Sequence, residues 1–524
     1  MTGAMPPASH ARMVRLLDVE PVGDFASEAD AAAQARRYAV LFADEGTARR
    51  GGLGQVCRVT NAYGESFALK TLLLAGEPAL DHARELAFRQ EFQSQRMLQG
   101  CDCVPRLHAW GSVDGSPAIL MEWVEGATLE RVRALLAADD AGRLSPPTVA
   151  ALGRDLFDAL SCLAAAAVPV VHRDVSPANV MVRSARHSLE QQVADGTFDL
   201  CLIDLGSSVA ADADARSLTR AGVAVRWATP DYAPPEMLTD DVAGIEELRQ
   251  SPAIDVFAAA SVLFELACAR LPFGEKGAMP ASPYRLKVEG TLVPATMAHA
   301  NAAALDAVLS REPDVAAAAA DALRGLPEPP PAEKVSRDLG RVDAQLARAL
   351  ASCLVADQSL RPSAAAVRDR LAAICAYYAA NVGHALRGEP LEPCGRQAAC
   401  ALPRPAPRRA ARVLSYACSL ALTAAVCVVL GMAGAGPACV AFALPLAAGL
   451  AVRGRVRNAR SALVRGAVGV VLGAAAAFLA AAAVAAPVLP EALLATCALA
   501  WLPVAVDYAT LPDAARPAAA SAKE

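Results

Sequence analysis

The stretch "VVHRDVSPANVMV", residues 170–182, decides how the chain folds. Its apolar ends, residues 170–171 and 180–182, predict two short buried strands, so the polar segment between them is a loop held at both ends. A loop fixed in this way can aim its side chains. Asp174 is a candidate proton acceptor and Asn179 a candidate metal-binding amide, although both residue types also commonly cap turns.

The composition points to more than one environment. The chain has 524 residues, of which 55% are hydrophobic and 20% charged, and its mean hydropathy is +0.31. We therefore expect more than one domain, with part of the chain in a membrane. The net charge of -5 does not favour nucleic acid as a partner. The 14 cysteines contain no C-x-x-C pair and indicate a reducing cytoplasm. Because the first thirty residues are acidic and have no apolar run, we expect no cleaved secretory signal.

A glycine-rich turn precedes the loop in the sequence, in "RRGGLGQVCRV". Gly51, Gly52 and Gly54 fall between two predicted strands, where missing side chains let backbone N–H groups approach a phosphate closely. Lys70, in "FALK" on the next strand, could reach the same phosphates with its ammonium group. Taken alone, the turn would be an ordinary hairpin and Lys70 a solvated charge at a sheet edge.

Carboxylates on two other segments add to this set. The predicted helix "ALDHARELAFRQEFQSQRML" offers either Glu91 or Glu85 as an ion-pair partner for Lys70. The segment "LIDLG" places Asp204 at the end of a predicted strand. Since Mg²⁺ prefers hard oxygen ligands and often takes only one or two from the protein, Asp204 and Asn179 are the candidate metal ligands.

Taken together, these segments resemble the eukaryotic-type (Hanks-type) serine/threonine protein kinase family in its bacterial-like form. The resemblance covers residues 39–378, with the motifs in family order. "HRDVSPAN" is similar to the catalytic loop, "DLG" to the metal-binding D-F-G motif, and "TPDYAPPE" to the end of the activation segment. The family implies an α+β, bilobal fold with a small β-rich N-lobe and a large α-helical C-lobe.

The resemblance also implies the site residues and their ligands. Asp174 would accept the proton of a Ser or Thr hydroxyl of a protein substrate, while Asn179 and Asp204 would hold Mg²⁺. Lys70, paired with Glu91, would position the phosphates of ATP. The residues expected to bind ATP are Gly51, Gly52, Gly54, Val56, Ala68, Lys70, Met121, Glu122 and Val124.

Further family features concern support and regulation. Glu236 and Arg361 are expected to form a buried ion pair, and Asp255 to steady the catalytic-loop backbone. Ser217 and Thr219 are candidate phosphorylation sites, which allows a homodimer whose copies phosphorylate each other.

Two residues depart from the family pattern. Arg49 stands where the first glycine of the turn is expected, and Ser176 replaces a lysine that helps to neutralise the transferring phosphoryl group. A catalytically weak or inactive ATP-binding pseudokinase scaffold at the membrane is therefore the alternative. A small-molecule phosphotransferase ranks last, because "TPDYAPPE" and the Arg361 helix are present.

The region after residue 412 changes character. Four apolar stretches, 413–432, 436–452, 466–488 and 492–506, predict about four transmembrane helices. All arginine clusters around them fall on one side, which predicts a multi-pass protein with its kinase region in the cytoplasm. The bacterial-like resemblance implies that this membrane is a bacterial plasma membrane. The expected domains are an N-terminal tail (1–38), the kinase domain (39–378), a Pro/Arg-rich juxtamembrane linker (379–412), the transmembrane region (413–509) and a C-terminal tail (510–524).

Overall fold

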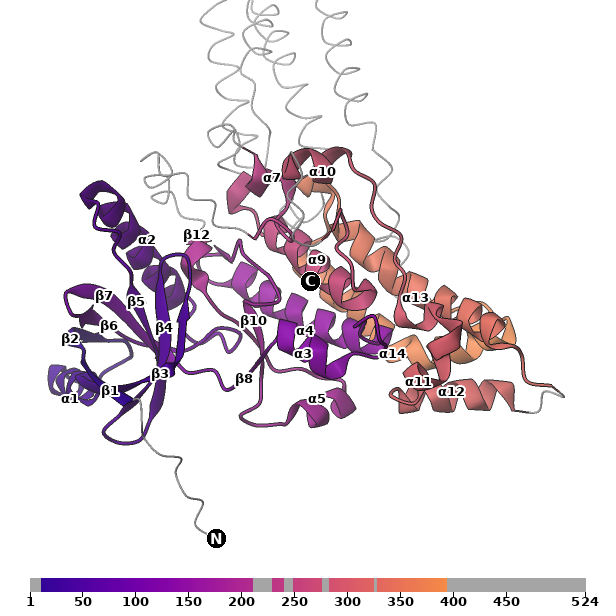
Figure 1. Ribbon diagram of the computed structural model, residues 1–524, viewed down its shortest axis with the longest axis horizontal. Coiled ribbons are helices and arrows are strands. Elements are labelled where there is room, and N and C mark those ends of the chain that lie inside the picture. The colour runs from indigo at the N-terminus through magenta and orange to yellow at the C-terminus, as the bar shows by residue number, and fades with distance from the viewer. Residues whose placement is uncertain (1–10, 211–228, 240–247, 276–281, 325–327, 394–524) are drawn as a thin grey trace, which may run out of the picture. The chain divides into compact units, whose positions relative to one another are not determined.

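The computed structural model describes residues 11–210, 229–239, 248–275, 282–324 and 328–393. They form a β-rich N-lobe and a helical C-lobe (Figure 1), which confirms the expected bilobal α+β fold. The four predicted membrane spans lie outside the described residues. Within the described ranges, no helix is long and apolar enough to cross a bilayer.

A single curled antiparallel sheet builds the N-lobe (Figure 1). Its strand order is β1-β3-β4-β5-β7-β6-β2, and β1 and β2 are separated in sequence only by Leu16. Residues 11–21 therefore pair with both edges of the sheet and close it on itself. The strands are β1 (Ala11–Arg15), β2 (Leu17–Pro21), β3 (Val40–Arg50), β4 (Gly54–Asn61), β5 (Ser66–Leu72), β6 (Leu107–Val113) and β7 (Ser116–Glu122).

This closure corrects in part the prediction that residues 1–38 are a tail or a short helix, because "EADAAAQARR" does form a helix but the residues before it belong to the sheet. Residues 11–21 are strands, and helix α1 (Glu28–Tyr38) follows them. Leu16 is 2% exposed and Tyr38 3%, and both pack inside the curled sheet with Leu41, Val59 and other core residues. The sequence concealed these strands because Leu16 is the one fully buried side chain among described residues 12–21, so no apolar alternation marks them.

Helix α2 (Pro78–Met97) packs beside the same sheet. Its Phe88 and Phe92 are buried against Leu72, Trp110 and Ile119. This packing fixes the rotation of α2, and with it the direction of the carboxylate at position 91.

The C-lobe is built around α9, whose residues 254–268 are all buried. Its helices are α3 (Leu129–Leu136), α4 (Pro146–Ala165), α5 (Leu189–Asp195), α7 (Pro235–Leu238), α9 (Ala253–Cys268), α10 (Pro283–Glu289), α11 (Leu305–Leu309), α12 (Pro313–Leu323), α13 (Ala332–Cys353) and α14 (Ala364–Arg387). Short strands β8 (Gly126–Thr128), β10 (Val180–Arg183) and β11 (Leu200–Leu202) form one small sheet, while β9 (Val170–Val171) pairs with β12 (Val209–Ala210).

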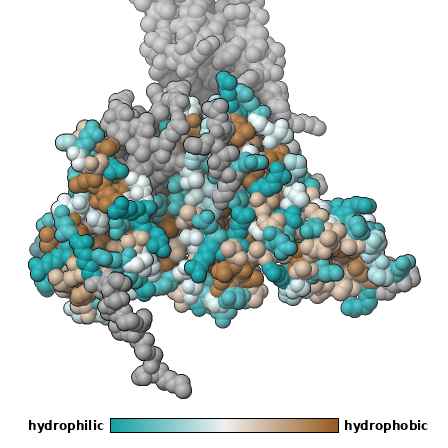
Figure 2. Space-filling model, in the orientation of Figure 1, coloured by the Kyte–Doolittle hydropathy of each residue, from teal (hydrophilic) through white to brown (hydrophobic). Residues whose placement is uncertain are grey.

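The C-terminal boundary of this lobe also differs from the prediction. Helix α14 continues to Arg387, nine residues beyond the expected end at 378. Val382, Ala385 and Leu386 are buried, so the end of helix α14 belongs to the lobe rather than to a linker. On the face seen in Figure 2, the strongly hydrophobic areas are small and separated by hydrophilic ones, as expected when most apolar side chains lie in the core.

Replacing Leu16 with Ala should lower the free energy of unfolding by about 2 to 5 kcal/mol, because it leaves a cavity inside the closed sheet. Leu17→Ala is the matched control, since Leu17 is 52% exposed and should change stability by about 0.5 kcal/mol or less. Thermal or urea unfolding measures both. Equal, small effects would show that residues 11–21 do not close the sheet.

Candidate active site

The loop between β9 and β10 is held by hydrogen bonds to the carboxylate of Asp255. Asp255, in the first turn of α9, accepts hydrogen bonds from the backbone N–H groups of His172 and Arg173, each at 2.8 Å. Arg173 has φ 70°, a left-handed conformation that costs energy for a residue with a side chain. The two bonds to buried Asp255 hold that conformation, as the family resemblance implied.

Both oxygens of Asp174 are oriented by neutral donors. Asn179 Nδ2 donates to Asp174 Oδ2 at 2.9 Å and to the Asp174 carbonyl at 3.0 Å. Thr229 donates to Asp174 Oδ1 from its N–H and from its hydroxyl, each at 2.8 Å. The contact between Thr229 and Asp174 was not predicted from the sequence. The signal available was the position of Thr229 at the start of "TPDYAPPE".

Lys70 lies between two carboxylates from different lobes. Its Nζ donates to Glu91 Oε1 at 2.5 Å and to Asp204 Oδ1 at 2.8 Å. Lys70 is 5% exposed and Glu91 2%, whereas Glu85 is exposed on the same helix. The structure thus selects Glu91 from the two alternatives.

The charge of Lys70 and that of Asp204 stabilise each other. Burial alone would lower the pKa of Lys70, but the charges of Glu91 and Asp204 outweigh it and raise that pKa above its usual value. Lys70 in turn lowers the pKa of Asp204, so its carboxylate stays ionised. An ammonium and an ionised carboxylate therefore face each other at the junction of the lobes.

Asp204 is tied to the catalytic loop through its neighbour. The N–H of Ile203 donates to the Asn179 carbonyl at 2.9 Å, and the His172 ring lies 3.1 Å from the Ile203 carbonyl. Leu205, which stands for the phenylalanine of D-F-G, is 2% exposed in the C-lobe core. These contacts fix Asp204 relative to Asp174.

The glycine turn lies over this cluster. Strand β3 pairs with β4 as far as Arg50 and Gln55, which leaves a turn of residues 51–53. A Cβ atom on Gly51 would lie 4.0 Å from Asp204 Oδ2, and one on Gly54 would lie 2.4 Å from the Thr71 carbonyl oxygen. Only glycine fits at position 54. Gly52 and Arg49 are both exposed on the turn and its approach.

The remaining expected ATP-binding residues follow the same strands. Val56 pairs across the sheet with Lys70, and Ala68 pairs with Met121. Met121 lies beside α2, since its sulfur accepts a hydrogen bond from Gln95 at 3.6 Å. The chain then passes to the C-lobe through Glu122 and Val124, the latter 8% exposed.

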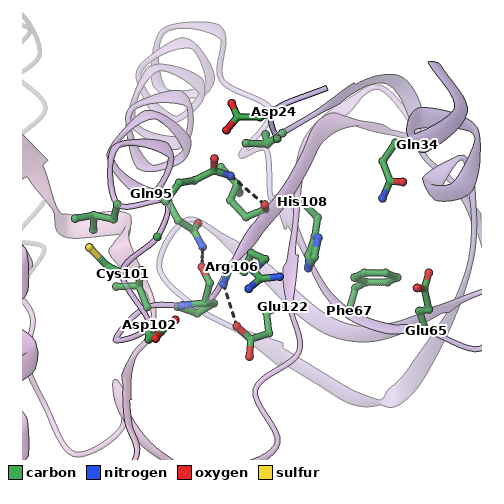
Figure 3. Close-up of a pocket in the computed structure, with 18 of the residues that line it drawn as sticks. Asp24, Gln34, Glu65, Phe67, Gln95, Cys101, Asp102, Arg106, His108 and Glu122 are labelled. Atoms are coloured by element: carbon green, nitrogen blue, oxygen red, sulfur yellow. Dashed lines mark hydrogen bonds between the residues drawn. The ribbon is translucent and has the colours of Figure 1, made fainter. Parts of the chain in front are cut away.

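A separate cavity of about 910 Å³ lies next to Glu122, where the chain passes to the C-lobe (Figure 3). It is bounded by residues 22–38, by β6 and by the loop before it, and Glu122 is the one predicted site residue in its wall. There the Glu122 carboxylate accepts a hydrogen bond from the Arg106 N–H at 3.0 Å. This cavity is therefore distinct from the cleft that holds Lys70 and Asp204.

The oxygens of Asn179 and Asp204 fit a bound Mg²⁺. Asn179 uses its Nδ2 as donor to Asp174, so its Oδ1 is left to face a cation. Asp204 Oδ1 accepts from Lys70 and from the Gly206 N–H, which leaves Oδ2 on a side chain that is 45% exposed. Two hard oxygen ligands are what a nucleotide-bound Mg²⁺ requires of a protein. In the described part of the chain, no group of three or more His, Cys, Asp or Glu could hold a metal by itself.

The segment that carries Thr229 ends in a buried ion pair. Arg361 donates to Glu236 through two parallel bonds, Nη1 to Oε1 at 2.6 Å and Nη2 to Oε2 at 3.0 Å. Glu236 is 7% exposed and Arg361 8%, which confirms the predicted buried pair.

Comparison with protein families matches residues 45–370 to the family described as "Protein kinase domain". Over 184 residues the chain is 35% identical to the serine/threonine-protein kinase PkaB of Streptomyces coelicolor, covering 35% of this chain and 38% of that protein. It is 29% identical to the serine/threonine-protein kinase PknH of Mycobacterium tuberculosis over 244 residues, 47% of this chain and 32% of that protein. The matches thus span only about a third of the length of these relatives.

Glu91→Gln should lower the free energy of unfolding by about 3 kcal/mol, because it breaks a buried ion pair and leaves Lys70 with one carboxylate partner. It should also weaken nucleotide binding, since Lys70 is then held closer to Asp204. Glu85→Gln, on the exposed face of the same helix, is the control and should change neither quantity. Calorimetric unfolding and nucleotide titration measure them, and matching results for the two variants would reject the assignment of Glu91.

Proposed function

The chain belongs to the protein kinase family, whose domain covers residues 45–370, and from this premise we propose that it transfers the γ-phosphate of ATP to Ser or Thr hydroxyls of proteins. The observation that carries the proposal is the meeting of Lys70, Glu91 and Asp204 at 2.5 and 2.8 Å beside the loop of Asp174. Phosphoryl transfer depends mainly on such positioning and charge stabilisation.

In this mechanism Asp174 receives the proton of the substrate hydroxyl. Asn179 and Thr229 hold its two oxygens, so the carboxylate keeps one orientation while the hydroxyl approaches. Lys70 binds the α and β phosphates, with Glu91 preventing the ammonium from swinging away. Asn179 and Asp204 would hold Mg²⁺, which would supply positive charge to the phosphates.

Ser176 limits the positive charge available for the reaction. It is 3% exposed, and its carbonyl accepts the N–H of Asn179 at 3.0 Å. The residue therefore shapes the loop and brings no cation to the transferring group. Transition-state charge then depends more heavily on Lys70 and the metal.

We extend the proposal to a membrane-anchored signalling kinase. Its support is the sequence alone: four apolar stretches between residues 413 and 509, with the arginine clusters on one side of them. With four spans, the kinase domain would lie on the cytoplasmic side, where ATP is present.

Asp174→Asn should lower the rate of phosphoryl transfer to a Ser/Thr substrate by about a hundred- to ten-thousandfold, because it removes the proton acceptor. Nucleotide affinity should stay unchanged. Asp195→Asn, at an exposed position on α5, is the control and should retain full activity. If the Asp174 variant transferred phosphate as fast as the wild type, the assignment would fail. If the wild type bound Mg-ATP but transferred no phosphate, the ATP-binding scaffold would replace it.

Alkaline carbonate extraction of membranes tests the anchor. We expect the full chain to stay in the membrane pellet, because four apolar helices are not released by removing peripheral contacts. A chain ending at residue 393 should be recovered in the supernatant. Release of the full chain into the supernatant would contradict the membrane proposal.

A further inference from the structure

Lys287 is a buried lysine outside the cluster just described. It lies on α10 and is 5% exposed. Its Nζ donates to three backbone carbonyls: Pro230 at 2.7 Å, Asp231 at 3.0 Å and Ala233 at 2.6 Å. An ammonium group carries three protons, so three converging acceptors match its charged form.

The three carbonyls belong to the turn that begins at Thr229. The N–H groups of Tyr232 and Ala233 donate to the Thr229 carbonyl at 3.1 and 3.0 Å, so residues 229–233 form one closed turn. Thr229 is also the residue whose N–H and hydroxyl hold Asp174 Oδ1. A shift of the Lys287 contacts would therefore move the groups that orient the carboxylate.

The surroundings of the Lys287 ammonium are partly apolar. Besides the three carbonyls, its Nζ faces the Phe257 ring, with 5.7 Å between Nζ and the ring centre. A buried ammonium costs free energy unless every donor is satisfied. The position thus holds a charged group whose visible role is to gather three carbonyls.

We propose that Lys287 is a positioning residue for phosphoryl transfer, fixing the turn of residues 229–233 so that Thr229 holds Asp174 in place. The inference rests on the proposed kinase function and adds a residue, 57 positions after Pro230, whose ammonium contacts the turn and not Asp174 itself.

The protonation of Lys287 supports this role. Burial lowers the pKa of Lys287 to about 7, opposed by the charge of Asp231. Its other neighbours are carbonyls and the Phe257 ring, and Glu236 on adjacent α7 is paired with Arg361. Loss of a proton leaves two N–H donors for three carbonyls, so the turn should loosen as the pH rises past neutrality.

A double-mutant cycle on kcat tests the coupling. Lys287→Met and Thr229→Val should each lower kcat by about ten- to a hundredfold, with nucleotide affinity unchanged. The double variant should lose clearly less than the product of the two, because both changes act on the orientation of one carboxylate. Lys334→Met, at a lysine side chain that is 53% exposed, is the control. A loss equal to the product would overturn the proposal.

Amide hydrogen exchange separates this inference from the kinase function itself. In Lys287→Met, exchange should become faster at Thr229, Tyr232 and Ala233, while the amides of His172 and Arg173, held by Asp255, stay protected. This holds even if the wild type transfers no phosphate. Unchanged exchange at residues 229–233 would reject the proposal that Lys287 fixes this turn.

The wild-type protein provides the test if Lys287→Met does not fold. Its kcat should fall as the pH is raised from 7 to 9, without a matching loss of nucleotide affinity. A flat kcat over that range would overturn the proposal.

Discussion

The contacts of the Lys70 ammonium with Glu91 and Asp204 join the two lobes at the active site. A buried ammonium is stable only with its charge compensated, and its two partners come from different lobes. The closed sheet and α2 supply Lys70 and Glu91, while the C-lobe strands supply Asp204, 134 residues further along the chain. Residues 11–21 serve this contact indirectly, because they complete the sheet that carries Lys70.

The two aspartates of the active site, Asp204 and Asp174, have different hydrogen-bond partners, which suit them to different roles. Asp204 faces an ammonium, which lowers its pKa and keeps it ionised for a metal. Asp174 is held by the amide of Asn179 and by Thr229, which orient it without adding a positive charge. Three buried polar side-chain contacts support this site. Asp255 accepts hydrogen bonds from two backbone N–H groups, Glu236 pairs with Arg361, and Lys287 donates to three carbonyls.

The short motifs could be recognised in the sequence because each has local residue types and spacing that its chemistry requires, and the family resemblance that they carry implied the bilobal fold. The sequence left Glu91 and Glu85 open, since only the packing of Phe88 and Phe92 sets the rotation of α2. It missed the first strands because a single buried leucine anchors them. The contacts of Thr229 and Lys287 could not be predicted from the sequence either. Hydrogen bonds between a side chain and the backbone over 55 and 57 residues leave no periodic pattern in the sequence.

We propose that Asp204 and Asn179 hold a divalent cation against a nucleotide positioned by Lys70. Electron paramagnetic resonance of Mn²⁺, titrated into the full chain with a non-hydrolysable ATP analogue, measures this site directly. We expect tight Mn²⁺ binding that requires the nucleotide and is largely lost in Asp204→Asn. Mn²⁺ binding of equal strength in the wild type and in Asp204→Asn would contradict this assignment of the metal ligands.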